Sequence, residues 1–357
     1  MKPKYIVLSI LNGASAVLFL IFTLIAASVK NSLPDQQTVT RWSDGSIPYA
    51  QVSIFTDSDS AMSIDTIFTA RADIDKKLTE NSLAPEKEGA RLRADAFSSA
   101  QKKLGVSSSR ASAEANVIAT GGDFFLFHPL DLLSGSYYSD SDIMHDRVML
   151  DEVLAWQLYG SSDIAGKPVI INGKYFYVAG VFGQDDSSAV KKVYGEKPRM
   201  FMSYSGMELL GETPLFTSYE VCLPNPVTGL AEKIVRETSA VSEDGSRIVE
   251  NSARYGLKNR FGIIADFGSR SVVDRAVVYP YWENAARITE DRSALLLVFQ
   301  ALALVVPLLT AVYLFSLLIH NRKKLFNKAA DAVKRVFCNI SKKPVRKTAK
   351  SDTEVSV

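Results

Sequence analysis

The 357-residue chain is 47% hydrophobic and 22% charged, with a formal net charge of +2. The charge is unevenly spread: removing the basic C-terminal tail and the two N-terminal lysines leaves −8 for residues 28–293. This negative balance excludes a nucleic-acid-binding role for that region, because such binding relies on Lys and Arg neutralising phosphates.

The chain begins with a charge-free stretch over residues 5–27, and a second such stretch covers residues 294–319. A helix needs about 20 apolar residues to cross the hydrocarbon core of a bilayer. Both stretches are therefore predicted transmembrane helices. Small residues at Ala26-Ala27-Ser28 leave open that the first stretch is a cleaved signal peptide. Its length exceeds the usual apolar core of such peptides and favours an uncleaved anchor.

Basic residues lie before the first stretch and after the second, which is the side of each stretch nearer a chain end. Residues 1–4 contain two lysines, and residues 320–357 contain eleven Lys or Arg against three acidic residues. Positive flanks are retained in the cytoplasm. We therefore expect a protein of the cell membrane that crosses it twice, with both termini cytoplasmic and residues 28–293 extracytoplasmic. Cys222 and Cys338 then lie on opposite sides and cannot pair within one chain.

The outer region opens with alternating apolar residues over 49–55, which predict a strand. Apolar residues recur at helical spacing between 62 and 78 and predict a helix. We expect a second helix around 85–104 and a returning strand over 116–120.

The middle of the region is richer in strands. Short apolar runs and a helical segment predict, in order, a strand over 147–150, a helix over 152–159, and strands over 168–171, 175–181 and 199–204. Asn172-Gly173 separates two of these strands and is a strong hairpin signal. A strand over 218–223, a helix over 227–239 and a strand over 245–252 close the region. The predicted architecture is α+β.

Residues 121–181 carry the most specific pattern. It consists of Gly-Gly-Asp-Phe-Phe at 121–125, Leu-Ser-Gly at 133–135, Tyr-Ser-Asp-Ser-Asp at 138–142, Ala-Trp-Gln-Leu-Tyr-Gly at 155–160, Ile-Ala-Gly-Lys at 164–167 and a hairpin ending Val-Ala-Gly-Val at 178–181. This pattern resembles the MacB-like periplasmic core domain of ABC-type permeases of the macrolide- and lipoprotein-exporter kind. Ser136, Tyr159 and Ala165 depart from the family's usual residues.

The resemblance implies an outer domain with two porter-like βαβ units and an inserted strand-rich lobe at about 121–214. Such permeases usually continue with three further membrane helices, the FtsX-like transmembrane block that contacts the ATPase. Here one apolar stretch and a basic tail follow, so we expect a chain without the complete block.

Two polar segments are candidate sites. The segment 160–167 resembles a phosphate loop, but it has one residue too many between its glycines and a proline after the lysine. His128, Asp131, Asp140, Asp142, His145 and Asp146 match no metal-ligand spacing. We interpret the first as a turn and the second as solvated polar residues, and we expect neither a metal nor a cofactor.

The predicted membrane helices contain candidate packing residues. Ser9 and Gly13 would allow a close approach of helices, Gln300 could donate a hydrogen bond to a neighbour, and Pro307 is typical of a kink. Either the two helices of this chain meet each other or they dock on a permease partner. The pattern does not decide between these alternatives.

The tail shows apolar residues at helical spacing among basic ones. This pattern predicts an amphipathic helix that contacts anionic lipid of the inner leaflet through Lys323, Lys324, Lys328, Lys334 and Arg335.

Three functional hypotheses follow. The first is an accessory or reduced permease-like subunit of an ABC-type export system, without ATPase activity of its own. Its expected partners are a separate nucleotide-binding ATPase and a multi-span permease, and its outer domain engages a substrate or partner protein. The alternative is a stand-alone membrane-anchored binding or sensing module. An extracytoplasmic enzyme is the weakest hypothesis, because no motif assembles a nucleophile, a base and an oxyanion site.

Overall fold

The structure is a computed structural model. It describes residues 3–85, 89–184, 187–194, 197–239, 241–242, 244–267 and 277–322. The chain divides into two compact units, one made of residues 1–22 and 299–357 and the other of residues 23–298.

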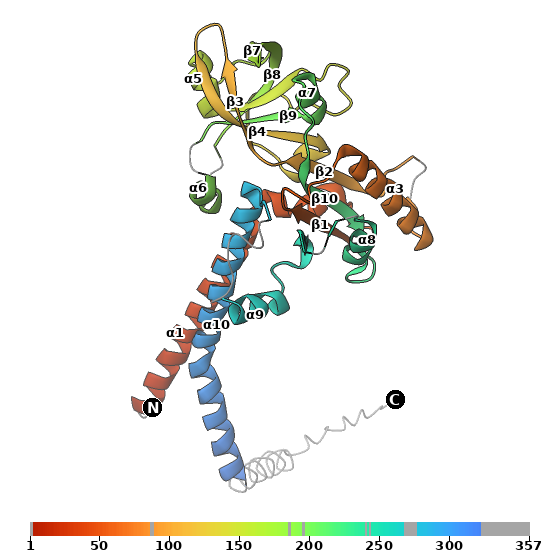
Figure 1. Cartoon of the computed structure of the whole chain (residues 1–357). Helices are drawn as coiled ribbons and strands as arrows, with labels where there is room; N and C mark the ends of the chain where they lie inside the picture. The colour runs from red at the N-terminus through yellow and green to blue at the C-terminus, as the bar shows by residue number, and fades with distance from the viewer. Residues whose placement is uncertain are drawn as a thin grey trace, which may run out of the picture. The chain divides into compact units, whose positions relative to one another are not determined.

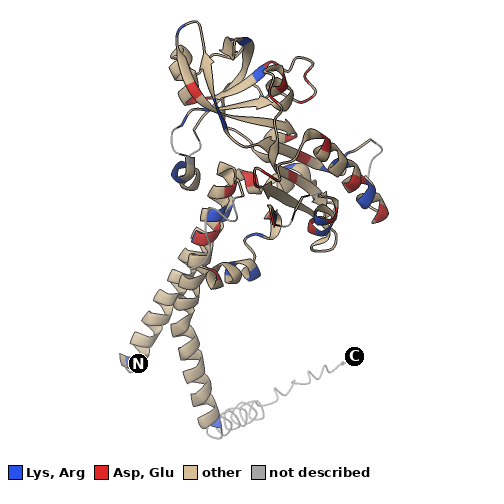
Figure 2. Ribbon diagram, viewed as in Figure 1, with Lys and Arg blue, Asp and Glu red and all other residues tan. Residues whose placement is uncertain are grey.

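The first unit contains parts of two long helices, α1 (Pro3–Asn31) and α10 (Tyr281–His320). Both are long and apolar enough to cross a membrane. Within this unit the Asn12 amide donates a hydrogen bond to the Thr310 hydroxyl at 3.0 Å, and the rings of Phe22 and Phe299 stack 5.4 Å apart. Figure 2 shows both helices almost free of charged residues in this unit.

The second unit contains two lobes joined by one continuous sheet (Figure 1). The strands of the first lobe lie in the order β11 (Ser246–Glu250), β1 (Tyr49–Thr56), β10 (Phe216–Pro224) and β2 (Ala94–Ser99), all antiparallel to their neighbours. Helix α3 (Ile64–Glu80) connects β1 to β2, and α8 (Leu230–Thr238) connects β10 to β11. Each helix thus joins two parallel strands that have one strand between them, which is the split form of a βαβ unit.

Helix α3 shows how the sequence places these elements. The Ser63 hydroxyl accepts a hydrogen bond from the Thr66 amide and caps the helix start. Its buried side chains recur on one face: Ile67, Ala70, Ile74 and Leu78. This stripe packs with apolar side chains of the first sheet in a common core. The helix predicted from 62–78 is confirmed.

The second lobe is a closed barrel of six strands. They are β3 (Lys102–Ser107), β4 (Ser112–Gly122), β6 (Arg147–Asp151), β7 (Pro168–Ile171), β8 (Lys174–Phe182) and β9 (Arg199–Ser203). Pairing runs β4–β3–β7–β8–β6–β9 and returns to β4 through the parallel β4–β9 pair. A short strand, β5 (Leu132–Gly135), is paired to β8. Apolar side chains of the six strands and of α5 (Glu152–Tyr159) form a common core.

The predicted hairpin in this barrel is confirmed. Asn172 and Gly173 link β7 to β8 with φ angles of 47° and 76°. Two successive positive φ angles give the turn whose twist matches that of paired strands, and Asn-Gly adopts them most readily.

The remaining described elements are short. They are η1 (Pro34–Gln36), α2 (Thr38–Trp42), α4 (Phe124–Phe127), α6 (Ser188–Tyr194), α7 (Tyr204–Leu209), η2 (Asn251–Ala253) and α9 (Leu257–Ala265).

The helix predicted around 85–104 is wrong, because that region contains β2 and the start of β3. Consecutive β2 residues from Ala94 to Ser98 are buried, since β10 and β4 flank the strand and both faces of the sheet are covered. A strand that is buried on both faces does not alternate between apolar and polar residues. Its apolar residues can therefore be mistaken for the apolar face of a helix. The barrel runs from Lys102 to Ser203, whereas the inserted lobe was expected at about 121–214. The expected start of the lobe therefore falls at the end of β4, inside the barrel.

Candidate functional site

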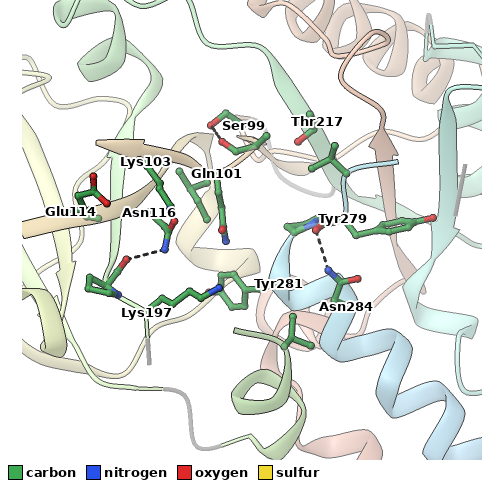
Figure 3. A pocket seen from close by; sticks show the side chains of 17 residues that line it. Ser99, Gln101, Lys103, Glu114, Asn116, Lys197, Thr217, Tyr279, Tyr281 and Asn284 are labelled. Carbon is green, nitrogen blue, oxygen red and sulfur yellow. Dashed lines mark hydrogen bonds between the residues drawn. The ribbon is translucent and has the colours of Figure 1, made fainter. Parts of the chain in front are cut away.

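A pocket of about 530 Å³ lies where both lobes meet the start of α10. The first lobe contributes Ser99 and Thr217, and the barrel contributes Lys103, Glu114 and Asn116. Tyr279, Tyr281 and Asn284 come from the segment that enters α10. Figure 3 shows these side chains around one space. A ligand in this pocket would therefore contact three parts of the domain at once.

The pocket wall combines charge, amides and aromatic surface. Lys103 and Lys197 supply ammonium groups. The Asn284 amide donates to the Tyr279 carbonyl at 3.2 Å, and the Asn116 amide donates to the Pro198 carbonyl at 3.4 Å (Figure 3). These bonds fix the two amides at the wall. Such a surface suits the binding of a polar ligand with apolar parts.

A buried charged group centred on His128 lies against Trp282 at the start of α10. Nδ1 of His128 lies 2.7 Å from Oδ1 of Asp35 in η1, and its Nε2 lies 2.5 Å from Oε2 of Glu220 in β10. The imidazole is 1% exposed. Burial alone would lower the pKa of His128, but the carboxylates of Glu220 and Asp35 outweigh it and raise that pKa to about 9. His128 is therefore a buried cation near neutral pH.

A second buried cation, Arg254, follows η2. Its guanidinium donates to both carboxylate oxygens of Glu283 and, at 2.5 Å, to Oε1 of Glu290. Burial disfavours the charged guanidinium, but these two carboxylates outweigh it and raise the pKa of Arg254. Both glutamates lie on α10, so this group joins the helix directly to the folded domain.

Hydrogen bonds connect the two charged groups. Ser53 in β1 donates to Glu220 at 2.6 Å and accepts from the Asn251 amide at 2.7 Å. The side-chain amide oxygen of Asn251, Oδ1, accepts from Arg254 at 3.0 Å. We call this chain of contacts the junction network: Asp35, His128, Glu220, Ser53, Asn251, Arg254, Glu283 and Glu290.

Aromatic rings cover the network. The Trp282 ring lies 4.2 Å from the His128 imidazole, centroid to centroid, and Phe124 packs on both rings. Trp282 is 1% exposed. The network links the segment that follows α1, two central strands of the first lobe and the first turns of α10. It thus ties the sequences adjoining both apolar helices to the same core.

The sequence interpretation of the His-Asp segment as solvated is wrong for His128. Asp140 is half-buried: its carboxylate accepts a hydrogen bond from the Gly122 amide, and partial burial raises the pKa of that carboxyl. Within the described residues, no group of three or more His, Cys, Asp or Glu side chains is arranged to hold a metal ion.

The candidate packing residues of the two apolar helices lie on α1 and α10. Ser9 and Gly13 are exposed on α1, and a Cβ at Gly13 would meet nothing within 4 Å. Gln300 is 8% exposed on α10, and Pro307 lies inside that helix. Asn12 was not singled out, although it contacts α10. The inner-leaflet residues Lys323, Lys324, Lys328, Lys334 and Arg335 lie outside the described residues.

Solved structures that are similar to part of this chain include domains of two transporters. The periplasmic region of MacB from Actinobacillus actinomycetemcomitans is 16% identical, with a TM-score of 0.43, over 62% of this chain and 94% of that one. The extracellular domain of the noncanonic ABC-type transporter YknZ from Gram-positive bacteria is 14% identical, with a TM-score of 0.37, over 56% of this chain and 99% of that one. Comparison with curated proteins finds no match.

A family model, the MacB-like periplasmic core domain, matches residues 7–229. The match covers more than half of the chain and includes the first apolar helix, the barrel and three strands of the first lobe. The family is the periplasmic domain of ABC-type permeases. With its two apolar helices, the chain is a membrane protein with an extracytoplasmic domain. The chain belongs to the MacB-like periplasmic core domain family.

Proposed function

We propose that this chain is an accessory or reduced permease-like subunit of an ABC-type export system. Its outer domain binds a substrate or partner protein, while a separate nucleotide-binding ATPase and a multi-span permease supply ATP hydrolysis and the remaining membrane helices. In this proposal both termini are cytoplasmic, and the basic tail contacts anionic lipid.

One observation carries the proposal beyond the family. Tyr281 and Asn284 line the pocket, while Glu283 of the same helical turn binds Arg254 in the junction network. Helix α10 then continues without interruption to His320. A ligand in the pocket therefore touches the helix that enters the apolar stretch, which is the arrangement expected of a subunit that responds to its cargo.

The test is purification of the tagged full chain from its native host in mild detergent, with mass spectrometry of co-purifying proteins. We expect an ATPase subunit together with a multi-span permease. A matched chain whose two apolar stretches are replaced by unrelated ones should lose both. Recovery of the chain alone would overturn the export-subunit proposal and favour the stand-alone binding module.

A pocket variant tests where the outer partner binds. Lys103 and Lys197 are exposed at the pocket, so their double replacement by glutamate should leave the fold intact. We expect the variant to keep the membrane partners and to lose extracytoplasmic ones. Lys233→Glu on α8 is the control, because its side chain is 70% exposed away from the pocket residues. Equal recovery with both variants would place the outer partner elsewhere.

A further inference from the structure

Helix α9 presents apolar side chains to the outside of the second unit. Leu257 and Phe261 are 62% and 61% exposed, and Phe267 just beyond the helix is 61% exposed. Leu257 and Phe261 are four residues apart and share one helical face. Ile264, half-buried, continues that stripe. A water-facing helix rarely carries two large apolar residues on one exposed face.

The opposite side of α9 is fixed to the protein. The Arg260 guanidinium donates two hydrogen bonds to the Ser293 carbonyl, at 3.1 and 2.8 Å. Ile263 is 9% exposed, and the Asn259 amide donates to the Ala253 carbonyl. The apolar stripe therefore cannot turn inward without breaking these contacts.

The contact with Ser293 determines where α9 lies along α10. Ser293 follows Glu290-Asp291-Arg292, and the charge-free stretch of α10 begins at the next residue, Ala294. Arg260 thus holds α9 where α10 passes from a charged to an apolar sequence, which is the expected membrane surface. Lys258 of α9 is exposed, and Figure 2 shows basic residues on this helix.

We propose that α9 is an interfacial helix that binds the phospholipids of the extracytoplasmic leaflet. Leu257, Phe261 and Phe267 insert among the acyl chains near the headgroups, roughly 5–10 Å into that boundary region. Lys258 remains at headgroup level and contacts lipid phosphate. Because α9 is bonded to the backbone at Ser293, this contact fixes the height of the outer domain above the membrane.

The test uses the full chain in proteoliposomes of phosphatidylcholine and phosphatidylglycerol. A nitroxide label is attached to Phe261→Cys in a Cys338→Ser background, since Cys222 is fully buried. Accessibility of the label to oxygen, which concentrates in lipid, is compared with its accessibility to a water-soluble nickel chelate. The control label is at Tyr175→Cys, an exposed barrel position.

We expect the ratio of oxygen to nickel accessibility to be several-fold higher at 261 than at 175, and a label at Leu257→Cys to agree with it. A ratio at 261 equal to that at 175 would place α9 in water and overturn the proposal. Protection at 261 from both reagents would also overturn it, because the stripe would then be covered by protein. Neither result depends on whether an ATPase co-purifies.

Discussion

The barrel is filled by apolar side chains from all six strands, whereas the first lobe meets the membrane-proximal segments through buried charges. The barrel residues come from one continuous stretch, but the junction network draws on residues from Asp35 to Glu290. The stability that apolar packing provides does not depend on pH or on the precise orientation of each group. A buried ion pair, by contrast, stabilises the fold only while both partners remain charged and in place. The barrel is thus suited to be a scaffold and the junction to be the part that responds.

The largest expected effect is at the junction. Arg254→Met removes the cation between Glu283 and Glu290 and leaves two buried carboxylates without it, which we expect to cost about 3–5 kcal/mol of unfolding free energy. Urea unfolding of the full chain in detergent, followed by tryptophan fluorescence, measures it. Arg236→Met is the control: that side chain is 50% exposed and pairs with Glu232, so about 0–1 kcal/mol is expected. Equal losses would mean that the network does not stabilise the junction.

A barrel substitution should approach this effect but differ in its pH dependence. Leu150 is fully buried in β6, and Leu150→Ala should cost about 2–5 kcal/mol through lost contacts and a cavity. The same cost is expected at pH 6 and pH 9, since the deleted group does not titrate. Leu209→Ala, at a 46% exposed position, should cost much less. A loss for Leu150→Ala that changes with pH would end the contrast between the two regions.

The junction should respond to pH through His128. Its pKa is raised from 6.5 to about 9 in the folded chain, so the protonated imidazole stabilises the fold fully below pH 6.5. That contribution is lost as pH rises through about 9, by roughly 3 kcal/mol at most. The neighbouring carboxylate of Glu220 has a lowered pKa, despite burial, because of His128, and its contribution is lost only at acidic pH.

Urea midpoints of the wild-type chain between pH 6 and pH 9.5 measure this loss. His128→Gln should flatten the decline, while Leu150→Ala should be less stable throughout and keep the wild-type slope. If His128→Gln and the wild-type chain lose stability in parallel, His128 is not the titrating group.

The smallest predicted effect concerns the β7–β8 turn. Gly173 has a φ angle of 76°, so Gly173→Ala forces a Cβ into the left-handed region at a cost of about 1–2 kcal/mol. Gly105→Ala in β3 is the matched control, since its backbone is not left-handed and a Cβ there meets nothing within 4 Å. Thermal unfolding of both variants measures the difference. A Gly105→Ala variant as destabilised as Gly173→Ala would contradict the role of backbone conformation.

Local signals predicted much of the outer domain. Asn172-Gly173 predicted the β7–β8 hairpin, because that dipeptide readily adopts the φ angles of the turn. The apolar stripe from Ile67 to Leu78 predicted α3, because one face of that helix is buried. The sequence could not reveal β2, because its neighbour β10 comes more than a hundred residues later and the side chains that cover its two faces belong to distant segments. Nor could spacing show that β4 pairs with β9 and closes the barrel.

The junction network was missed for a related reason. His128 lies in a polar segment whose composition is typical of an exposed turn. No pattern in the neighbouring sequence indicates that Asp35 and Glu220 are its partners. The pocket was missed as well, because Ser99, Lys103 and Tyr281 are ordinary residues until the fold brings them together. An isolated histidine beside a phenylalanine-rich turn, Phe124–Phe127, was the one local sign of burial.

The position of β10 has a consequence for how the protein is made. β1 pairs with β10 and β11, and both strands come after the whole barrel in the chain. β1 therefore lacks its partner on one edge until the chain has emerged past Pro224 and on the other until it has emerged past Glu250, while the barrel can close on contacts within its own stretch. Because closing long loops slows folding, assembly of the first lobe should be the late step. β1, the first strand to emerge, is thus the strand that waits longest for its partners.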